Sequence, residues 1–278
     1  MDSNPLKQFF RQPAIYLRLP GKGKGWAPGS IDMPANGEIP IYPMTAIDEI
    51  TYRTPDALFN GEAVVSVIQS CVPAIKDAWA APATDLDSIM VAIRIASYGH
   101  TMDIGTKCPN CDTDNEFGLD LRSIIDNLKS ADYDQTLTLG DLTFKFRPLD
   151  YREMTKNSQI QFEQQKILQM INNEEVPEEN KVTQLNEMMK KILDVTVLAI
   201  AETIEEIRTN SAIVSEKDFI LDFLKNCDRQ LFDKIKNTVL KLREDSELKP
   251  LNITCPSCQH KYQQAFTLDM ARFFGSAS

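Results

Sequence analysis

The motifs Cys108-Pro-Asn-Cys111 and Cys255-Pro-Ser-Cys258 decide how this 278-residue chain is expected to fold. Each is a Cys-Pro-x-Cys knuckle, a tight turn on which two thiolates can ligate one ion while backbone N–H groups point at the sulfurs. Structural zinc sites take four such ligands in a closed tetrahedron, and two knuckles supply all four. We therefore expect a single structural Zn²⁺ bound by Cys108, Cys111, Cys255 and Cys258.

The residues that follow the two knuckles are also alike. EFGLDLR occupies positions 116–122 after the first knuckle, and AFTLDMAR occupies positions 265–272 after the second. Both segments contain Phe-x-Leu-Asp, and a knuckle with a returning strand is half of a zinc ribbon. This duplication favours a fold in which the two halves meet.

The distance between the knuckles along the chain is unusual. Ordinary ribbons separate their cysteine pairs by roughly 15–20 residues, so the long intervening segment here is predicted to be an insertion whose ends return to one place. The entropy of closing a loop grows only logarithmically with its length. Zinc binding contributes about 10 kcal/mol or more in small finger peptides, which can offset that cost.

Other interpretations of the cysteines stay open at this stage. The four thiols can be reduced and metal-free, can bind iron as in rubredoxin, or can form a redox couple, although no βαβ pattern accompanies them. His260, two residues after the second knuckle, can replace one cysteine as a ligand. Cys71 and Cys227 are predicted to lie outside the metal site.

The rest of the chain predicts an α+β protein that is mostly helical, with a discontinuous zinc ribbon and a large helical insertion. Residues 1–50 are rich in proline and predict an extended arm, because proline disfavours helix interiors and central strands. The expected regions are the arm at 1–50, a helical region at 51–103, the ribbon at 104–149 plus 249–278, and the helical insertion at 150–248.

Within these regions, local patterns predict individual elements. Apolar residues predict helices over 63–72 and 86–96, with Asp85 as the cap of the second. Alternation around Gly140-Asp141 predicts a hairpin over 136–146. Apolar residues at helical spacing predict one long amphipathic helix over 182–209.

Composition excludes several classes of function. The formal net charge of −10 argues against a broad nucleic-acid surface, which needs clustered Lys and Arg. No apolar run reaches the length of a membrane span, and the N-terminus lacks the pattern of a secretory signal. The sequence has two histidines, no His-Glu-x-x-His and no Walker-type loop. A four-thiolate site has no open position for water, so we expect no enzymatic activity.

Several segments resemble the T4-type phage baseplate protein family. They are NGEIPIYPMTA at 36–46, TPDALFNGE at 54–62, IQSCVPAIK at 68–76 and IRIASYG at 93–99, followed by the first knuckle. The resemblance implies a role in the central hub of a contractile tail, with other baseplate and hub proteins, and the tape-measure protein, as candidate partners. It implies no catalytic residues.

The expected function is therefore a non-enzymatic structural or assembly protein of the baseplate hub that acts through protein–protein contacts. Its expected location is the virion tail baseplate, or the host cytoplasm during tail assembly. Two alternatives remain: a transient chaperone for hub or tape-measure proteins that is absent from the mature virion, and a zinc-ribbon protein that binds nucleic acid. The oligomeric state, the contacted hub protein and the order of the arm by itself are left open.

Overall fold

The computed structural model describes residues 4–54, 59–172, 178–265 and 273–274. The chain divides into two compact units, and each is described by itself. Unit 1 comprises residues 1–130 and 246–278, and unit 2 comprises residues 131–245. The described parts contain both helices and strands, so the protein belongs to the α+β class, as predicted.

Unit 1 is assembled around helices α3 (Glu62–Cys71) and α4 (Ala83–Tyr98), which confirm and extend the two helices predicted there. Most residues of α4 from Thr84 to Arg94 are buried, so the helix is covered on nearly all sides. Strands β1 (Ile15–Leu17) and β2 (Ile39–Ile41) of the proline-rich segment form a two-stranded antiparallel ribbon. Its inward-facing side chains are fully or almost fully buried: Leu17, Ile39 and Ile41.

Shorter elements complete the first part of unit 1. Helix α1 (Ala46–Tyr52) begins with a capping box in which the Thr45 and Asp48 side chains each accept a hydrogen bond from the other residue's backbone N–H. Other short helical elements of unit 1 are η1 (Pro5–Phe9), η2 (Ala78–Ala80) and α5 (Leu121–Asn127).

Asp85 does not cap α4, contrary to the prediction. The helix begins after Pro82, and Asp85 lies in its first turn with its carboxylate fully buried. That carboxylate accepts hydrogen bonds from the Gly21 N–H at 2.6 Å and from the Trp26 Nε1–H at 2.8 Å. A side chain on Gly21 would meet the Asp85 carboxylate, with a Cβ only 2.9 Å from Oδ1. Asp85 therefore anchors the segment from Gly21 to Trp26, which contains three glycines, rather than the end of the helix.

Unit 2 contains an antiparallel four-stranded sheet in the order β5-β6-β7-β8. The strands are β5 (Thr136–Leu139), β6 (Leu142–Phe146), β7 (Ile204–Arg208) and β8 (Ile213–Val214). The predicted hairpin is confirmed as β5 and β6, which join through a positive φ at Gly140. This hairpin lies within the region 104–149 that was expected to belong to the ribbon, whereas its β6 strand pairs with β7 of unit 2.

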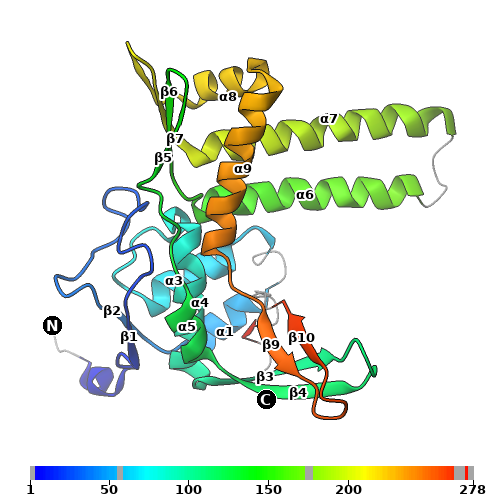
Figure 1. Cartoon of the computed structure of the whole chain (residues 1–278). Coiled ribbons are helices and arrows are strands. Elements are labelled where there is room, and N and C mark those ends of the chain that lie inside the picture. Colours follow the sequence, from blue (N-terminus) through cyan, green and yellow to red (C-terminus); the bar gives the residue numbers. More distant parts are fainter. Residues whose placement is uncertain (1–3, 55–58, 173–177, 266–272, 275–278) are drawn as a thin grey trace. The chain divides into compact units, whose positions relative to one another are not determined.

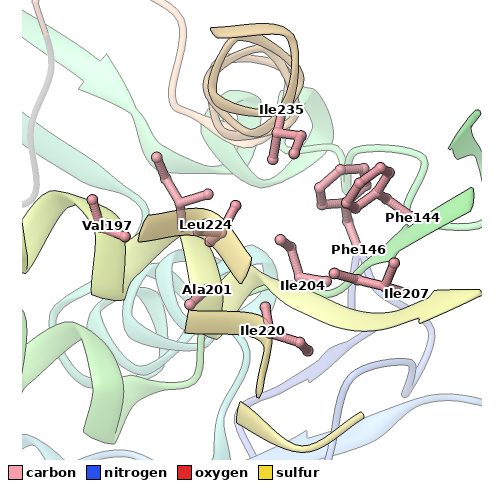
Figure 2. Close-up of a cluster of buried hydrophobic side chains, with 10 residues drawn as sticks. Phe144, Phe146, Val197, Ala201, Ile204, Ile207, Ile220, Leu224 and Ile235 are labelled. Atoms are coloured by element: carbon pink, nitrogen blue, oxygen red, sulfur yellow. The ribbon is translucent and has the colours of Figure 1, made fainter. Parts of the chain in front are cut away.

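The helices of unit 2 are α6 (Tyr151–Asn172), α7 (Glu178–Thr203), α8 (Lys217–Asn226) and α9 (Arg229–Ser246). Helices α6 and α7 run side by side (Figure 1). Figure 2 shows the core of this unit, in which two phenylalanines of β6 face aliphatic side chains from α7, β7, α8 and α9.

The prediction of one helix over 182–209 is wrong at its C-terminal end. Helix α7 ends at Thr203, and the chain continues directly into β7. Ile204 and Ile207 are three residues apart, which suits a helix, and yet both are buried in the core. A register shift between Lys145 and Phe146 on β6 lets both face inward from a strand: Phe144 pairs with Ile207, and Phe146 pairs with Ile204.

In the part of the chain that the structure describes, no helix has both the length and the apolar character needed to cross a membrane.

Candidate metal centre

Each cysteine knuckle lies at the tip of an antiparallel hairpin in unit 1. The first hairpin consists of β3 (Thr101–Lys107) and β4 (Asp114–Asp120), and the second consists of β9 (Leu251–Thr254) and β10 (Lys261–Gln264). The cysteines occupy the turns that join these strands. The predicted returning strand after the second knuckle is thus observed as β10, whereas the second Phe-x-Leu-Asp copy, residues 266–269, lies outside the described residues.

The two knuckles have the same backbone structure. In each, the first cysteine donates its N–H to the carbonyl five residues later, and the residue after the second cysteine donates back to the first cysteine's carbonyl. The bonds are Cys108 N to Thr113 O (3.0 Å), Asp112 N to Cys108 O (3.0 Å), Cys255 N to His260 O (2.9 Å) and Gln259 N to Cys255 O (2.9 Å).

The residue after each knuckle has a left-handed backbone, with φ of 56° at Asp112 and 60° at Gln259. Polar residues such as Asp adopt this conformation more readily than β-branched ones. The sequence similarity of the two knuckles therefore extends to their conformation.

The four sulfurs lie within 4.8 Å of one another, although the knuckles are far apart in sequence. The Sγ atoms of Cys108 and Cys258 are 3.7 Å apart, and those of Cys111 and Cys255 are also 3.7 Å apart. A zinc–thiolate bond of about 2.3 Å gives a tetrahedron with edges of about 3.8 Å. The donor set and its size therefore fit one tetrahedral metal ion.

The environment of the sulfurs differs between the buried and the more open positions. Cys108 and Cys255 are fully buried, while Cys111 and Cys258 are partly exposed. Burial raises the pKa of Cys108 to about 11, against the backbone N–H groups directed at its sulfur. The N–H of Cys258, followed by that of Ser257, lowers the pKa of Cys255 to about 6. Hydrogen bonding by Thr113 lowers the pKa of Cys111.

These shifts have a simple chemical meaning. The turns supply N–H donors that stabilise negative sulfur, which is the form that binds a metal. Burial opposes the ionisation of Cys108, and a bound cation would compensate the negative charge on its sulfur. The site is therefore suited to a cation with thiolate ligands.

The other residues considered from the sequence lie elsewhere. Among the described residues, the group able to hold a metal consists of the four cysteines and does not include His260. The exposed His260 ring stacks on Tyr262 instead, with the ring planes 9° apart. Cys71 is buried on α3, and burial raises its pKa to about 12. Cys227 lies in unit 2, outside the cluster.

Sequence reasoning missed four residues around the sulfurs: Thr106, Asn110, Asn115 and Tyr262. Asn110 and Asn115 donate side-chain hydrogen bonds to cysteines of the second knuckle, and the Thr106 and Tyr262 hydroxyl groups form a hydrogen bond with each other. One signal was present in the sequence, since Asn110 lies inside the first knuckle. No local pattern indicates that Asn115 or Thr106 is covered by a hairpin from a distant part of the chain.

The fold and the site together define a class: an α+β protein in which two hairpins distant in sequence bring four cysteines together as a candidate metal site. A family model described as T4 bacteriophage base plate protein matches residues 30–275, which is most of the chain. The chain belongs to this family. Comparison with curated proteins and with solved structures found no match.

Proposed function

We propose that this protein is a non-enzymatic structural or assembly component of the central hub of a phage baseplate. The observation that carries the proposal is the family match over residues 30–275. Membership of a baseplate family suggests a location in the virion tail and other tail proteins as partners. It also favours a structural role over a catalytic one.

We further propose that Cys108, Cys111, Cys255 and Cys258 bind one structural Zn²⁺. Four thiolates close the coordination shell of zinc and leave no position for a substrate or a reactive water. When bound, the ion would cross-link two hairpins that are far apart in the sequence. Its role here is to hold unit 1 together, so that the surface of the unit keeps one shape for its partners.

Exposed apolar side chains support a function in protein–protein contacts. On α6 and α7, Phe162, Met189 and Leu193 are 53%, 63% and 61% exposed. In the N-terminal segment of unit 1, Phe9 and Tyr16 are 76% and 65% exposed. Met189 and Leu193 are four residues apart and therefore lie on one face of α7, and an exposed apolar face is typical of an interaction site. The net charge of −10 favours protein partners over nucleic acid.

Quantitative mass spectrometry of purified virions tests the place in the tail. A structural hub component should be present in fixed proportion to other baseplate proteins and should co-purify with hub subcomplexes. Its presence in assembly intermediates and absence from virions would instead support the transient chaperone. Absence from both would overturn the proposed function.

Elemental mass spectrometry with a thiol count tests the metal. The expected result is one zinc per chain. The folded protein should then show one readily reactive thiol, Cys227, because Cys71 is fully buried. A chelator should expose the ligand thiols to the reagent. Iron in place of zinc, or no metal with reactive knuckle thiols, would contradict the zinc assignment.

A further inference from the structure

Two polar side chains of the first hairpin are buried at one position of its sheet. Thr106 of β3 and Asn115 of β4 are directly opposite each other in the antiparallel register. Opposite residues project from the same face of a sheet, and each of these two is only 7% exposed. Burying a polar side chain is costly unless it is hydrogen-bonded, so the partners of this pair are informative.

Both side chains find partners on the second hairpin. The Thr106 hydroxyl is 2.6 Å from the Tyr262 hydroxyl of β10. The Asn115 amide Nδ2 donates to the Thr113 carbonyl at 3.1 Å and to the Cys255 sulfur at 3.7 Å. The pair therefore connects the first hairpin to both a strand and the knuckle of the second.

A third contact reaches the other sulfur of the second knuckle. Asn110, inside the first knuckle, donates its Nδ2 to the Cys258 sulfur at 3.6 Å. Both sulfurs of the second knuckle thus receive a side-chain amide from the first hairpin. Among the contacts of the described residues, the first knuckle receives no side-chain amide in return, and Cys111 has the Thr113 hydroxyl at 3.3 Å instead.

We infer that Thr106, Asn110, Asn115 and Tyr262 form a polar seam that positions the second knuckle against the first and strengthens metal binding at the proposed four-cysteine site. The inference rests on that site for its effect on affinity. Amide donors stabilise the negative charge that remains on metal-bound thiolates, and groups of this kind also orient the ligands. The contacts of the seam join protein atoms only, so the proposed seam does not require a metal ion to form.

Cobalt(II) binding tests the effect on affinity, with competition by a chelator of known affinity. The variants are Asn115→Ala, Asn110→Ala and the control Asn127→Ala, whose exposed amide donates to Ser123 O within its own helix. Removing a group that supports metal ligands typically costs about 10–100-fold in affinity, and we expect losses of this size for the first two variants. The control should bind as wild type does.

The absorption spectrum distinguishes a hydrogen bond to sulfur from general loosening of the fold. An N–H donor lowers the energy of the sulfur electrons. Its loss in Asn115→Ala should therefore move the sulfur-to-cobalt charge-transfer band to longer wavelength while four-thiolate coordination persists. An unchanged affinity and band position in both Asn110→Ala and Asn115→Ala would overturn the role in metal binding.

Hydrogen–deuterium exchange of the metal-free protein tests the seam without any metal. Tyr262→Phe keeps the ring and removes only the hydroxyl that forms a hydrogen bond with Thr106. We expect segment 251–264 to exchange faster in this variant and in Asn115→Ala than in metal-free wild type. Exchange equal to wild type in both variants would overturn the seam. A wild-type chain that binds no cobalt would overturn the proposed metal site, while the exchange result would still decide the docking of the hairpins.

Discussion

Replacing both cysteines of the second knuckle should destabilise unit 1 by removing a cross-link. In Cys255→Ser/Cys258→Ser, a metal held by the first knuckle can no longer connect the two hairpins. Unit 2 has its own core around β6 and β7. We therefore expect the loss of stability in unit 1.

The magnitude follows from the length of chain that the metal closes. Cys108 and Cys258 are 150 residues apart, and the chain-entropy relation gives about 5 kcal/mol for a cross-link closing a loop of that size. If unit 2 stays folded while unit 1 unfolds, the flexible part of the loop is roughly 35 residues and the same relation gives about 4 kcal/mol. We expect the unfolding free energy of unit 1 to fall by about 4–5 kcal/mol.

The chain offers a selective assay for this loss. Its two tryptophans, Trp26 and Trp79, both belong to unit 1. Urea denaturation followed by tryptophan fluorescence therefore reports on unit 1. Adding a chelator to wild type should reproduce the effect of the double variant, and the chelator should not affect the variant further. Cys227→Ser is the matched control, because it makes the same chemical change outside the cluster.

One result would refute the reasoning. If the double variant and chelator-treated wild type both unfold at the urea concentration of untreated wild type, no ion cross-links the hairpins. The nearness of the four sulfurs would then have to come from the seam and the surrounding fold alone.

Two further predictions concern unit 1. Burial, with a smaller contribution from Glu247, raises the pKa of Asp87 from its ordinary 3.8 to about 6, so the folded state holds the proton more tightly and stability is lost as pH rises from about 4 to about 6. Asp87→Asn should therefore be more stable than wild type by roughly 2–3 kcal/mol at pH 7 and equal to it near pH 4 in urea titrations; a difference that does not change with pH would contradict the assignment. Arg11 donates hydrogen bonds to Pro43 O at 2.6 Å and to Ser70 O at 2.7 Å, so Arg11→Ala should release the N-terminal segment and speed its proteolysis and hydrogen exchange. Arg18→Ala, which removes an exposed ion pair, should leave that segment protected, and equal protection in both variants would show that Arg11 does not anchor it.

Local sequence patterns predicted those parts of the fold whose structure depends on near neighbours. The apolar periodicity over 63–72 and 86–96 corresponds to α3 and α4, and Gly140 supplies the positive φ of the predicted hairpin. The two Cys-Pro-x-Cys turns have the same conformation because the same short-range hydrogen bonds form in both. These features need only a few consecutive residues, so the pattern is visible in the sequence.

The errors and omissions involve contacts between distant segments. Ile204 and Ile207 are at helical spacing, and only pairing with β6 across a bulge makes them part of a strand. Asp85 lies near the start of a helix, where a cap was expected, yet its hydrogen-bond partners are Gly21 and Trp26. In both cases a tertiary contact outweighed the local preference.

Some features of the candidate metal centre were likewise predictable from the sequence, and others depend on the tertiary structure. The sequence by itself determined the family, the four cysteines that are candidate ligands and the two turns that present them, because these depend on residue identity and short-range spacing. Only the tertiary structure decided that the sulfurs come within 4.8 Å and that Asn115 and Thr106 are buried beneath Tyr262 and Cys255. The reason is physical: the two hairpins meet through contacts spanning 140 residues or more, and such contacts depend on the path of the whole unit rather than on the residues beside them in sequence.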